Sequence, residues 1–217
     1  MVQSLVLERP RERTLGRGAH TRERILDAAQ ASVLQKGFAA TSIDEVLFEA
    51  GITKSGFFYH FRDKNDLARG LLDRFQAEDA QIYDEIFARA EQLNEDPLHS
   101  YLVGLKLLAE TMADLPNGHP GCLVATFVNQ DQLFDAGVRA MMVETINSWR
   151  ENFLGRLERI AEVYPPRIDI DLPTLANMLG CVVDGGIIMS RALRTPQILA
   201  DQVMAYRAFV RVVFLGV

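Results

Sequence analysis

Residues 41–67 read TSIDEVLFEAGITKSGFFYHFRDKNDL, and this stretch decides the fold. It predicts two short helices joined by a tight turn, followed by the start of a third helix. Ser42 is a natural N-cap, and Glu45 completes a capping box ahead of an apolar run with helical spacing. Gly51 suits the left-handed conformation that ends a helix, and Thr53 can cap the next one. A helix-turn-helix of this kind presents its second helix to the major groove of DNA.

The stretch also resembles the DNA-binding domain of the TetR family of transcriptional regulators. The resemblance covers roughly residues 20–70 and rests on many positions in the right order. The matching positions are Thr21–Leu26, Ala28–Ala29, Gly37–Phe38, Thr41–Ile43, Ala50–Lys54, Phe61, Lys64 and Leu67. The resemblance implies a DNA-binding regulator with a second, larger helical domain.

Eight residues of the predicted second helix and its flanks are candidates for contact with DNA: Thr41, Thr53, Lys54, Ser55, Gly56, Tyr59, His60 and Lys64. Lys54 and Tyr59 can donate hydrogen bonds to phosphates, which position a protein on the duplex. Ser55, Tyr59 and His60 can reach base edges, which carry the sequence information. We therefore expect this helix to be the recognition helix, which contacts the bases in the major groove.

The remaining four candidates are expected to contact DNA for other reasons. Gly56 allows close approach of the backbone to the duplex, and Thr53 lies at a helix N-terminus, where free N–H groups favour a phosphate. Thr41 and Lys64 match positions where the family commonly contacts the DNA backbone. Phe58 departs from the family pattern, which most often has Tyr there, because it lacks the hydroxyl that would donate to a phosphate.

Charge is distributed unevenly along the 217 residues. The net charge is −6, which by itself argues against DNA binding. Residues 1–75 carry twelve Lys and Arg against ten Asp and Glu, a net +2, and residues 76–217 carry eleven against nineteen, a net −8. An acidic body with a locally basic end is compatible with binding a polyanion at that end only.

The composition favours a soluble protein. Hydrophobic residues make up 48% and charged residues 24%, which is typical of globular domains. No apolar run reaches the ~18 residues of a membrane helix, and the charges in residues 1–19 interrupt any signal-peptide core. The two cysteines, Cys122 and Cys181, are too few for a disulfide framework. We therefore expect a cytoplasmic protein that does not enter a membrane.

The fold class predicted is all-α, with about nine helices and no strand. Helical periodicity, Pro at helix starts and Gly or Pro at helix ends mark the elements. Residues 1–19, with four arginines, are expected to form a flexible basic arm. Residues 20–66 form the predicted helix-turn-helix domain, and residues 67–217 the helical domain for ligand binding and dimerisation.

The larger domain is expected to bind a small-molecule effector and a second copy of the chain. The candidate ligand-binding residues are large apolar side chains: Tyr101, Met112, Phe127, Met141, Trp149 and Met178. For any single one of them core packing is the favoured interpretation, and it is the set as a whole that the family resemblance assigns to a ligand pocket. The last two helices are rich in apolar and small residues, so two copies can pack them into a four-helix bundle. The family resemblance implies the same homodimer through helices 8 and 9.

Cys122 is a possible redox or electrophile sensor, because it follows Pro120–Gly121 and is expected in the first turn of a helix, which favours a thiolate. The alternative is a small buried hydrophobic residue. Cys181 is expected to be packed. The four histidines do not pair with cysteines or carboxylates at metal-ligand spacing, so no metal or cofactor is predicted.

These observations predict a homodimeric regulator, a repressor released from a palindromic double-stranded DNA operator by a small-molecule effector. One alternative is a thiol-based sensor of the same fold acting through Cys122. Another is an all-helical enzyme or carrier, but no nucleophile–base pair, carboxylate pair or phosphate loop is present at telling spacing. We therefore do not expect an enzyme.

Overall fold

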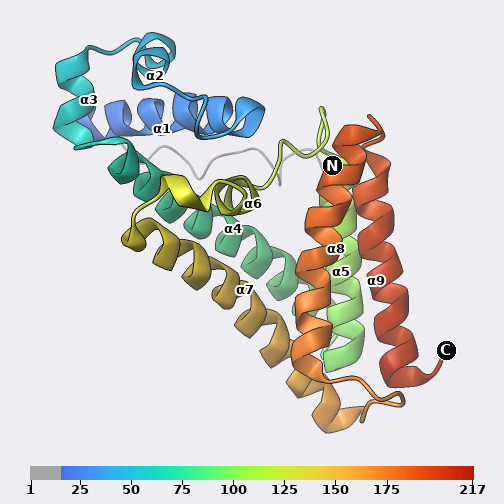
Figure 1. Cartoon of the computed structure of the whole chain (residues 1–217). Helices are drawn as coiled ribbons and strands as arrows, with labels where there is room; N and C mark the ends of the chain where they lie inside the picture. Colours follow the sequence, from blue (N-terminus) through green and yellow to red (C-terminus); the bar gives the residue numbers. More distant parts are fainter. Residues whose placement is uncertain (1–15) are drawn as a thin grey trace. The chain divides into compact units, whose positions relative to one another are not determined.

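The computed structural model describes residues 16–217 (Figure 1). Within this range the chain forms nine α-helices and one 3-10 helix, so the all-α prediction is confirmed. The elements are α1 (Arg17–Lys36), α2 (Ile43–Ala50), α3 (Lys54–His60), α4 (Lys64–Leu93), α5 (Pro97–Ala113), α6 (Leu123–Val128), η1 (Asp131–Leu133), α7 (Ala136–Val163), α8 (Leu172–Ala192) and α9 (Gln197–Leu215).

The chain divides into two compact units. Unit 1 comprises residues 1–77 and 122–143, and unit 2 comprises residues 78–121 and 144–217. These units differ from the predicted division at residue 66, because the first part of α4 and the segment of residues 122–143 group with the helix-turn-helix. Part of the predicted basic arm lies outside the described residues. Residues 17–19 of that arm are the first residues of α1.

Local capping signals build the helix-turn-helix as predicted. Ser42 caps α2 by accepting the Glu45 N–H at 3.2 Å, and Thr53 caps α3 by accepting the Gly56 N–H at 3.2 Å. Gly51 ends α2 with φ 60° and ψ 44°, the left-handed conformation that glycine adopts without steric cost. These caps fix both ends of the turn between α2 and α3.

The core of unit 1 joins the helix-turn-helix to the segment of residues 122–143. Phe38, which follows α1, packs on Phe127 of α6 with ring centroids 5.2 Å apart and on Phe134 at 4.6 Å. Phe57 of α3 is fully buried and packs on Phe61. These five buried rings all contribute to the apolar interior of unit 1.

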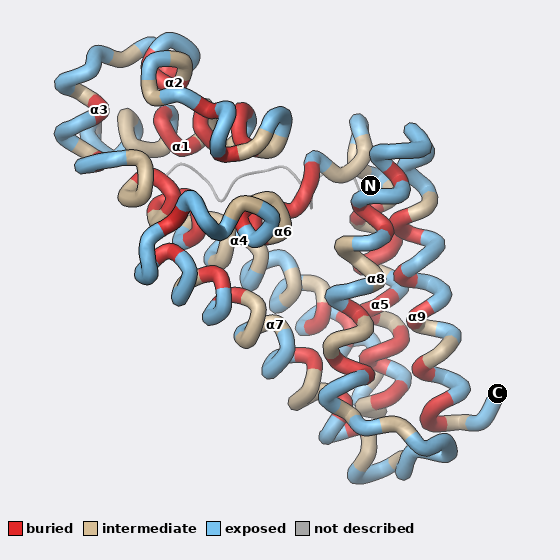
Figure 2. The backbone as a smooth tube through the Cα atoms, viewed as in Figure 1, coloured by how far each residue is buried: buried red, intermediate tan, exposed pale blue. Residues whose placement is uncertain are grey.

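Unit 2 is built around α5, α8 and α9, which lie side by side (Figure 1). Its buried core includes Phe87, Tyr101, Leu105, Phe153, Leu157, Leu175, Leu179, Tyr206, Val210 and Phe214. Tyr206 is held inside this core because its hydroxyl donates to the Leu175 carbonyl at 3.0 Å. Figure 2 shows that buried and exposed positions alternate along α8 and α9, so each helix leaves one face uncovered.

Two expectations are corrected in α8. Cys181 is exposed in the single chain, because it lies on the uncovered face of the helix. In the described residues α8 is also the one helix that is long and apolar enough to cross a membrane by length and composition. The expectation that no such stretch exists was wrong. Asp184 interrupts the apolar run, but the average hydropathy of the helix stays high enough for a membrane span. Core helices of soluble proteins pass the same test.

Candidate nucleic-acid interface

The outer face of α3 presents polar groups to solvent. Lys54, Ser55 and Tyr59 are all exposed, and Tyr59 has an exposed fraction of 82%. Ser55 and Tyr59 are four residues apart and share a face of the helix, and Lys54 lies exposed in its first turn. Phe57 on the opposite face is fully buried and anchors the helix. The local sequence therefore holds an ammonium and two hydroxyl groups outward on a rigid support.

The other residues of α3 and its N-cap contact neighbouring groups of the same chain. His60 is half-buried, and its ring meets the Tyr59 ring edge-on with centroids 4.9 Å apart. Gly56 is half-buried, and an added Cβ would lie 3.4 Å from the Thr53 hydroxyl. The Thr53 hydroxyl is engaged as the cap and also lies 3.0 Å from the Ser55 hydroxyl. Phe58 is 45% exposed and packs edge-on against Phe57.

Two candidates are engaged inside unit 1. Thr41 is buried, and its hydroxyl donates to the Gly37 carbonyl at 3.0 Å. The Lys64 ammonium donates to the Phe38 carbonyl at 2.6 Å and lies 4.4 Å from the centre of the Phe38 ring. Burial lowers the pKa of Lys64. Both residues therefore hold the turn after α1 in place, and neither is presented outward as Lys54 and Tyr59 are.

Sequence reasoning missed Phe48 on α2, which is 82% exposed. It follows the buried Leu47 by one position, which turns it about 100° away from the apolar face of the helix. This one-position offset from Leu47 could have predicted that Phe48 is exposed. Arg24 of α1 was also missed: its guanidinium donates to the Ala50 carbonyl and covers the C-terminal end of α2.

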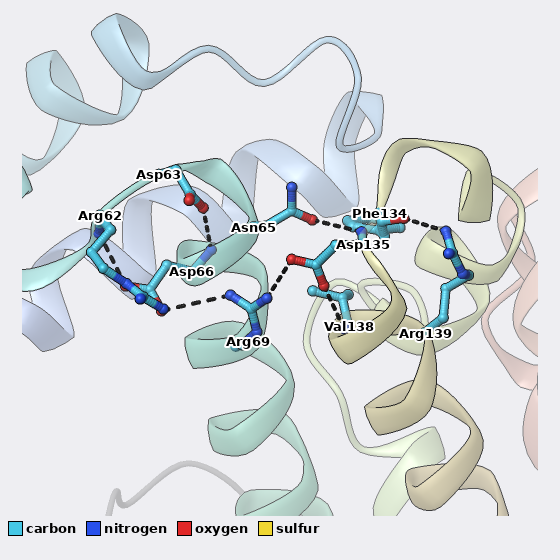
Figure 3. A network of polar contacts seen from close by, with 9 residues as sticks. All are labelled: Arg62, Asp63, Asn65, Asp66, Arg69, Phe134, Asp135, Val138 and Arg139. Carbon is cyan, nitrogen blue, oxygen red and sulfur yellow. Dashed lines mark hydrogen bonds and ion pairs between the residues drawn. The ribbon is translucent and has the colours of Figure 1, made fainter.

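A polar network fastens the start of α7 to the start of α4 (Figure 3). Arg69 of α4 pairs with Asp135, whose backbone N–H donates to the Asn65 side chain at 3.1 Å. The Asp135 carboxylate also accepts the Val138 N–H at 3.0 Å, which lowers its pKa, and Arg69 adds to the effect. Asp66 extends the network by accepting the Arg62 N–H at 3.0 Å. The network helps to make residues 122–143 part of the unit that carries α3.

The comparisons with known proteins agree with this geometry. The HTH-type transcriptional repressor BepR of Brucella suis is 26% identical over 182 residues, which cover 80% of this chain and 81% of BepR. A family profile described as "Bacterial regulatory proteins, tetR family" matches residues 25–71, the range from α1 through α3 into α4. The chain belongs to the TetR family.

This TetR-family chain is therefore a ligand-responsive, DNA-binding transcriptional regulator, and regulators of this family act as dimers. Solved structures agree on the fold. A TetR-family regulator from Cytophaga hutchinsonii has a TM-score of 0.74 at 18% identity, covering 93% of this chain and 98% of that one. The reduced form of Escherichia coli NemR has a TM-score of 0.72 at 18% identity, covering 89% and 96%.

The six candidate effector residues of this TetR-family regulator fall into both units. Phe127 and Met141 belong to unit 1, and the other four belong to unit 2. Tyr101 is buried, its hydroxyl lies 3.3 Å from that of Tyr206, and its ring stacks on Phe87. It also lines a hollow of about 320 Å³, together with Glu91, Glu95, Pro97, Ser100, Arg156 and Arg159. Met112 is buried, and Met178 packs against the core of unit 2.

Trp149 hydrogen-bonds a buried carboxyl group that sequence reasoning missed. Asp79 of α4 bonds to the Trp149 side chain, and its Oδ2 atom is buried without a hydrogen-bond partner among the described residues. Burial raises the pKa of Asp79 to about 7; the Trp149 bond lowers it in part, and the nearby charge of Asp184 raises it further. Asp79 lies four residues after Phe75 and four before Tyr83, on the side of α4 where both rings are half-buried. That spacing was the signal.

Cys122 is the N-cap of α6 and is buried, with an exposed fraction of 9%. The Ala125 N–H donates to its sulfur at 3.4 Å. The predicted position at a helix start agrees with this placement, and burial limits the access of a reagent to the thiol. Within the described residues no group of three or more His, Cys, Asp or Glu side chains can hold a metal ion.

Proposed function

We propose that this TetR-family regulator is a cytoplasmic repressor that binds a palindromic operator as a homodimer and leaves it when a small-molecule effector binds. The repressor role is supported by the similarity to BepR, whose name describes a transcriptional repressor. The exposed face of α3, with Lys54, Ser55 and Tyr59 projecting from a helix capped at Thr53, is the observation that supports DNA reading most directly. We propose no catalytic role.

The experiment is a gel shift with DNA flanking the protein's own gene. A two-fold dimer is expected to prefer one pseudo-palindromic site with half-sites ~34–36 Å apart over random DNA. Its affinity is expected to fall steeply with salt, because phosphate contacts release counterions. Equal affinity for random DNA at every salt concentration would contradict the proposal. Native mass spectrometry of the purified protein can then identify a co-purifying effector.

We propose that the dimer forms through the uncovered faces of α8 and α9. Ile188 is 63% exposed, Met189 50% and Val212 40%. Gly180 and Gly185 have no atom within 4 Å of the position of an added Cβ, so packing inside one chain does not require glycine there. Small and apolar residues on one face permit close approach of the same helices from a second copy.

Ile188→Glu is expected to shift the protein from dimer to monomer, since it places a carboxylate in a desolvated interface. Light scattering after size-exclusion chromatography measures the mass. Ile82→Glu on α4 is the matched control, because Ile82 is also exposed, at 44%. The interface is misassigned if Ile188→Glu stays dimeric or if the control dissociates as well. Operator affinity should fall in Ile188→Glu only, because a monomer contacts one half-site.

A further inference from the structure

Unit 2 contains a hollow of about 460 Å³ between the loop of residues 116–121 and the turn from α8 to α9. Its lining residues are Asn117, Gly118, His119, Pro120, Ser190, Arg191, Arg194 and Pro196. They include two arginines and a histidine and no carboxylate. Unit 2 as a whole carries ten Lys and Arg against seventeen Asp and Glu, a net −7. The hollow is therefore a locally basic feature of an acidic unit.

The loop side of the hollow supplies a neutral N–H donor. The His119 Nδ1 atom accepts the Gly121 N–H at 3.2 Å, so the neutral ring carries its proton on Nε2. Burial, and then the charge of Arg191, lower the pKa of His119, so the ring is neutral at pH 7. The Arg191 guanidinium donates to the Pro120 carbonyl at 2.9 Å, which holds its positive charge against the loop.

The helix side ends in a turn whose acceptors are already engaged. The Ser190 carbonyl accepts the Thr195 N–H at 2.9 Å, and the Met189 carbonyl accepts the Leu193 N–H at 3.0 Å. The Ser190 hydroxyl, in turn, donates to the Ile187 carbonyl at 3.0 Å. The carbonyl oxygens of Met189 and Ser190 are therefore engaged, and Arg191 and Arg194 bring positively charged donors to the lining of the hollow.

Arg194 occupies a backbone position that favours glycine. Its φ is 53°, and it is the one residue other than glycine with positive φ in the range that the structure describes. The bond from Thr195 to Ser190 closes the kind of helix end in which glycine usually takes this place. The Arg194 side chain makes no hydrogen bond or ion pair with any other described residue. The backbone therefore does not explain the arginine, and its guanidinium is left to contact a ligand.

We propose that this hollow binds the anionic group, a carboxylate or a phosphate, of a small molecule. Arg194 and Arg191 supply the charge, and the His119 Nε2–H supplies a neutral donor. Guanidinium groups match both oxyanions because they donate parallel hydrogen bonds from a planar fork. The volume lies within the range of small-molecule sites, so the hollow can hold the anion together with part of the body that carries it. The proposal does not depend on the DNA-binding role.

The test titrates the full-length protein with inorganic phosphate and, separately, with acetate, with ionic strength held constant by sodium chloride. The His119 ring signal in ¹H–¹³C NMR, assigned by its loss in His119→Gln, reports on the hollow directly. We expect a saturable shift with one or both anions. Saturation by phosphate alone indicates a phosphate-bearing ligand, and saturation by acetate alone indicates a carboxylate.

Arg194→Gly is the decisive variant, because glycine adopts the positive φ of this position without steric strain and at the same time removes the charge. We expect its anion affinity to fall at least tenfold, by about the contribution of one charged hydrogen bond, while its melting temperature stays equal or rises. Arg194→Asn, which also tolerates positive φ, replaces it if the glycine variant does not fold. Arg89→Gln, an exposed arginine of α4, is the control that keeps wild-type affinity. Unchanged affinity in Arg194→Gly, or no saturable shift in the wild type, overturns the proposal.

Discussion

Lys54→Ala and Tyr59→Ala are each expected to weaken operator binding by about 100-fold at moderate salt. A hydrogen bond that involves a charged group contributes about 1.5–3 kcal/mol. The two-fold dimer loses the contact twice, and each 1.4 kcal/mol corresponds to tenfold in affinity. Lys54 and Tyr59 are exposed donors at the surface of α3, so no intramolecular role compensates for their loss. Gel shift or fluorescence anisotropy over a range of salt concentrations measures the effect.

The salt dependence separates the two residues. Lys54→Ala should reduce the slope of log affinity against log salt by about two per dimer, one for each phosphate released. Tyr59→Phe keeps the ring, so it tests the hydroxyl alone. Lys106→Ala on α5 removes the same charge from unit 2, where Lys106 is exposed, and should leave the slope unchanged. All variants should stay dimeric; equal losses in Lys54→Ala and Lys106→Ala would mean that net charge, and not α3, governs binding.

Asp79→Asn is expected to stabilise the protein at pH 8 by about 2–4 kcal/mol, and by much less at pH 5. The folded-state pKa of Asp79, about 7, lies above the ordinary value of 3.8. Above pH 7 both states are ionised, so the folded state carries a buried charge that asparagine removes. As pH falls below 7 the folded state binds a proton that the unfolded state does not, so the wild type gains stability until about pH 4.

Thermal unfolding of both proteins between pH 5 and pH 8 measures this difference. At pH 8 the melting temperature of Asp79→Asn should exceed that of the wild type by roughly 5–10 °C, given about 2–4 °C per kcal/mol for a chain of this size. Asp84→Asn, at an exposed position of the same helix, should match the wild type at every pH. A constant gap between Asp79→Asn and the wild type across the range would show that burial of the charge is not its cause.

Most of the helix boundaries could be predicted because they depend on neighbours in the chain. Ser42 and Thr53 cap their helices through an N–H group three residues away, and Gly51 ends α2 through its own φ angle. Pro97 and Asp171 mark helix starts for the same kind of reason. Each signal acts within one turn of helix, where a single sequence carries all the information.

The candidate site was less predictable, because exposure depends on distant parts of the chain. Tyr59 could be assigned to the outer face of α3 from its spacing to the buried Phe57 alone. Thr41 and Lys64 have equally polar side chains, but the turn at Gly37–Phe38 engages both of them. No local pattern distinguishes a lysine that faces solvent from one that, like Lys64, donates to a carbonyl in the connection between two other helices.

The sequence by itself determined an all-helical chain, the helix-turn-helix and the outward face of α3, since helical periodicity and capping are short-range effects. Only the tertiary structure decided that residues 122–143 group with the helix-turn-helix, through Phe127 in its core and the pair of Arg69 with Asp135. It also decided that the Asp79 Oδ2 atom is buried and that Arg194 lines a basic hollow. These features depend on contacts between segments tens of residues apart, and the identity of such neighbours is not encoded in local spacing.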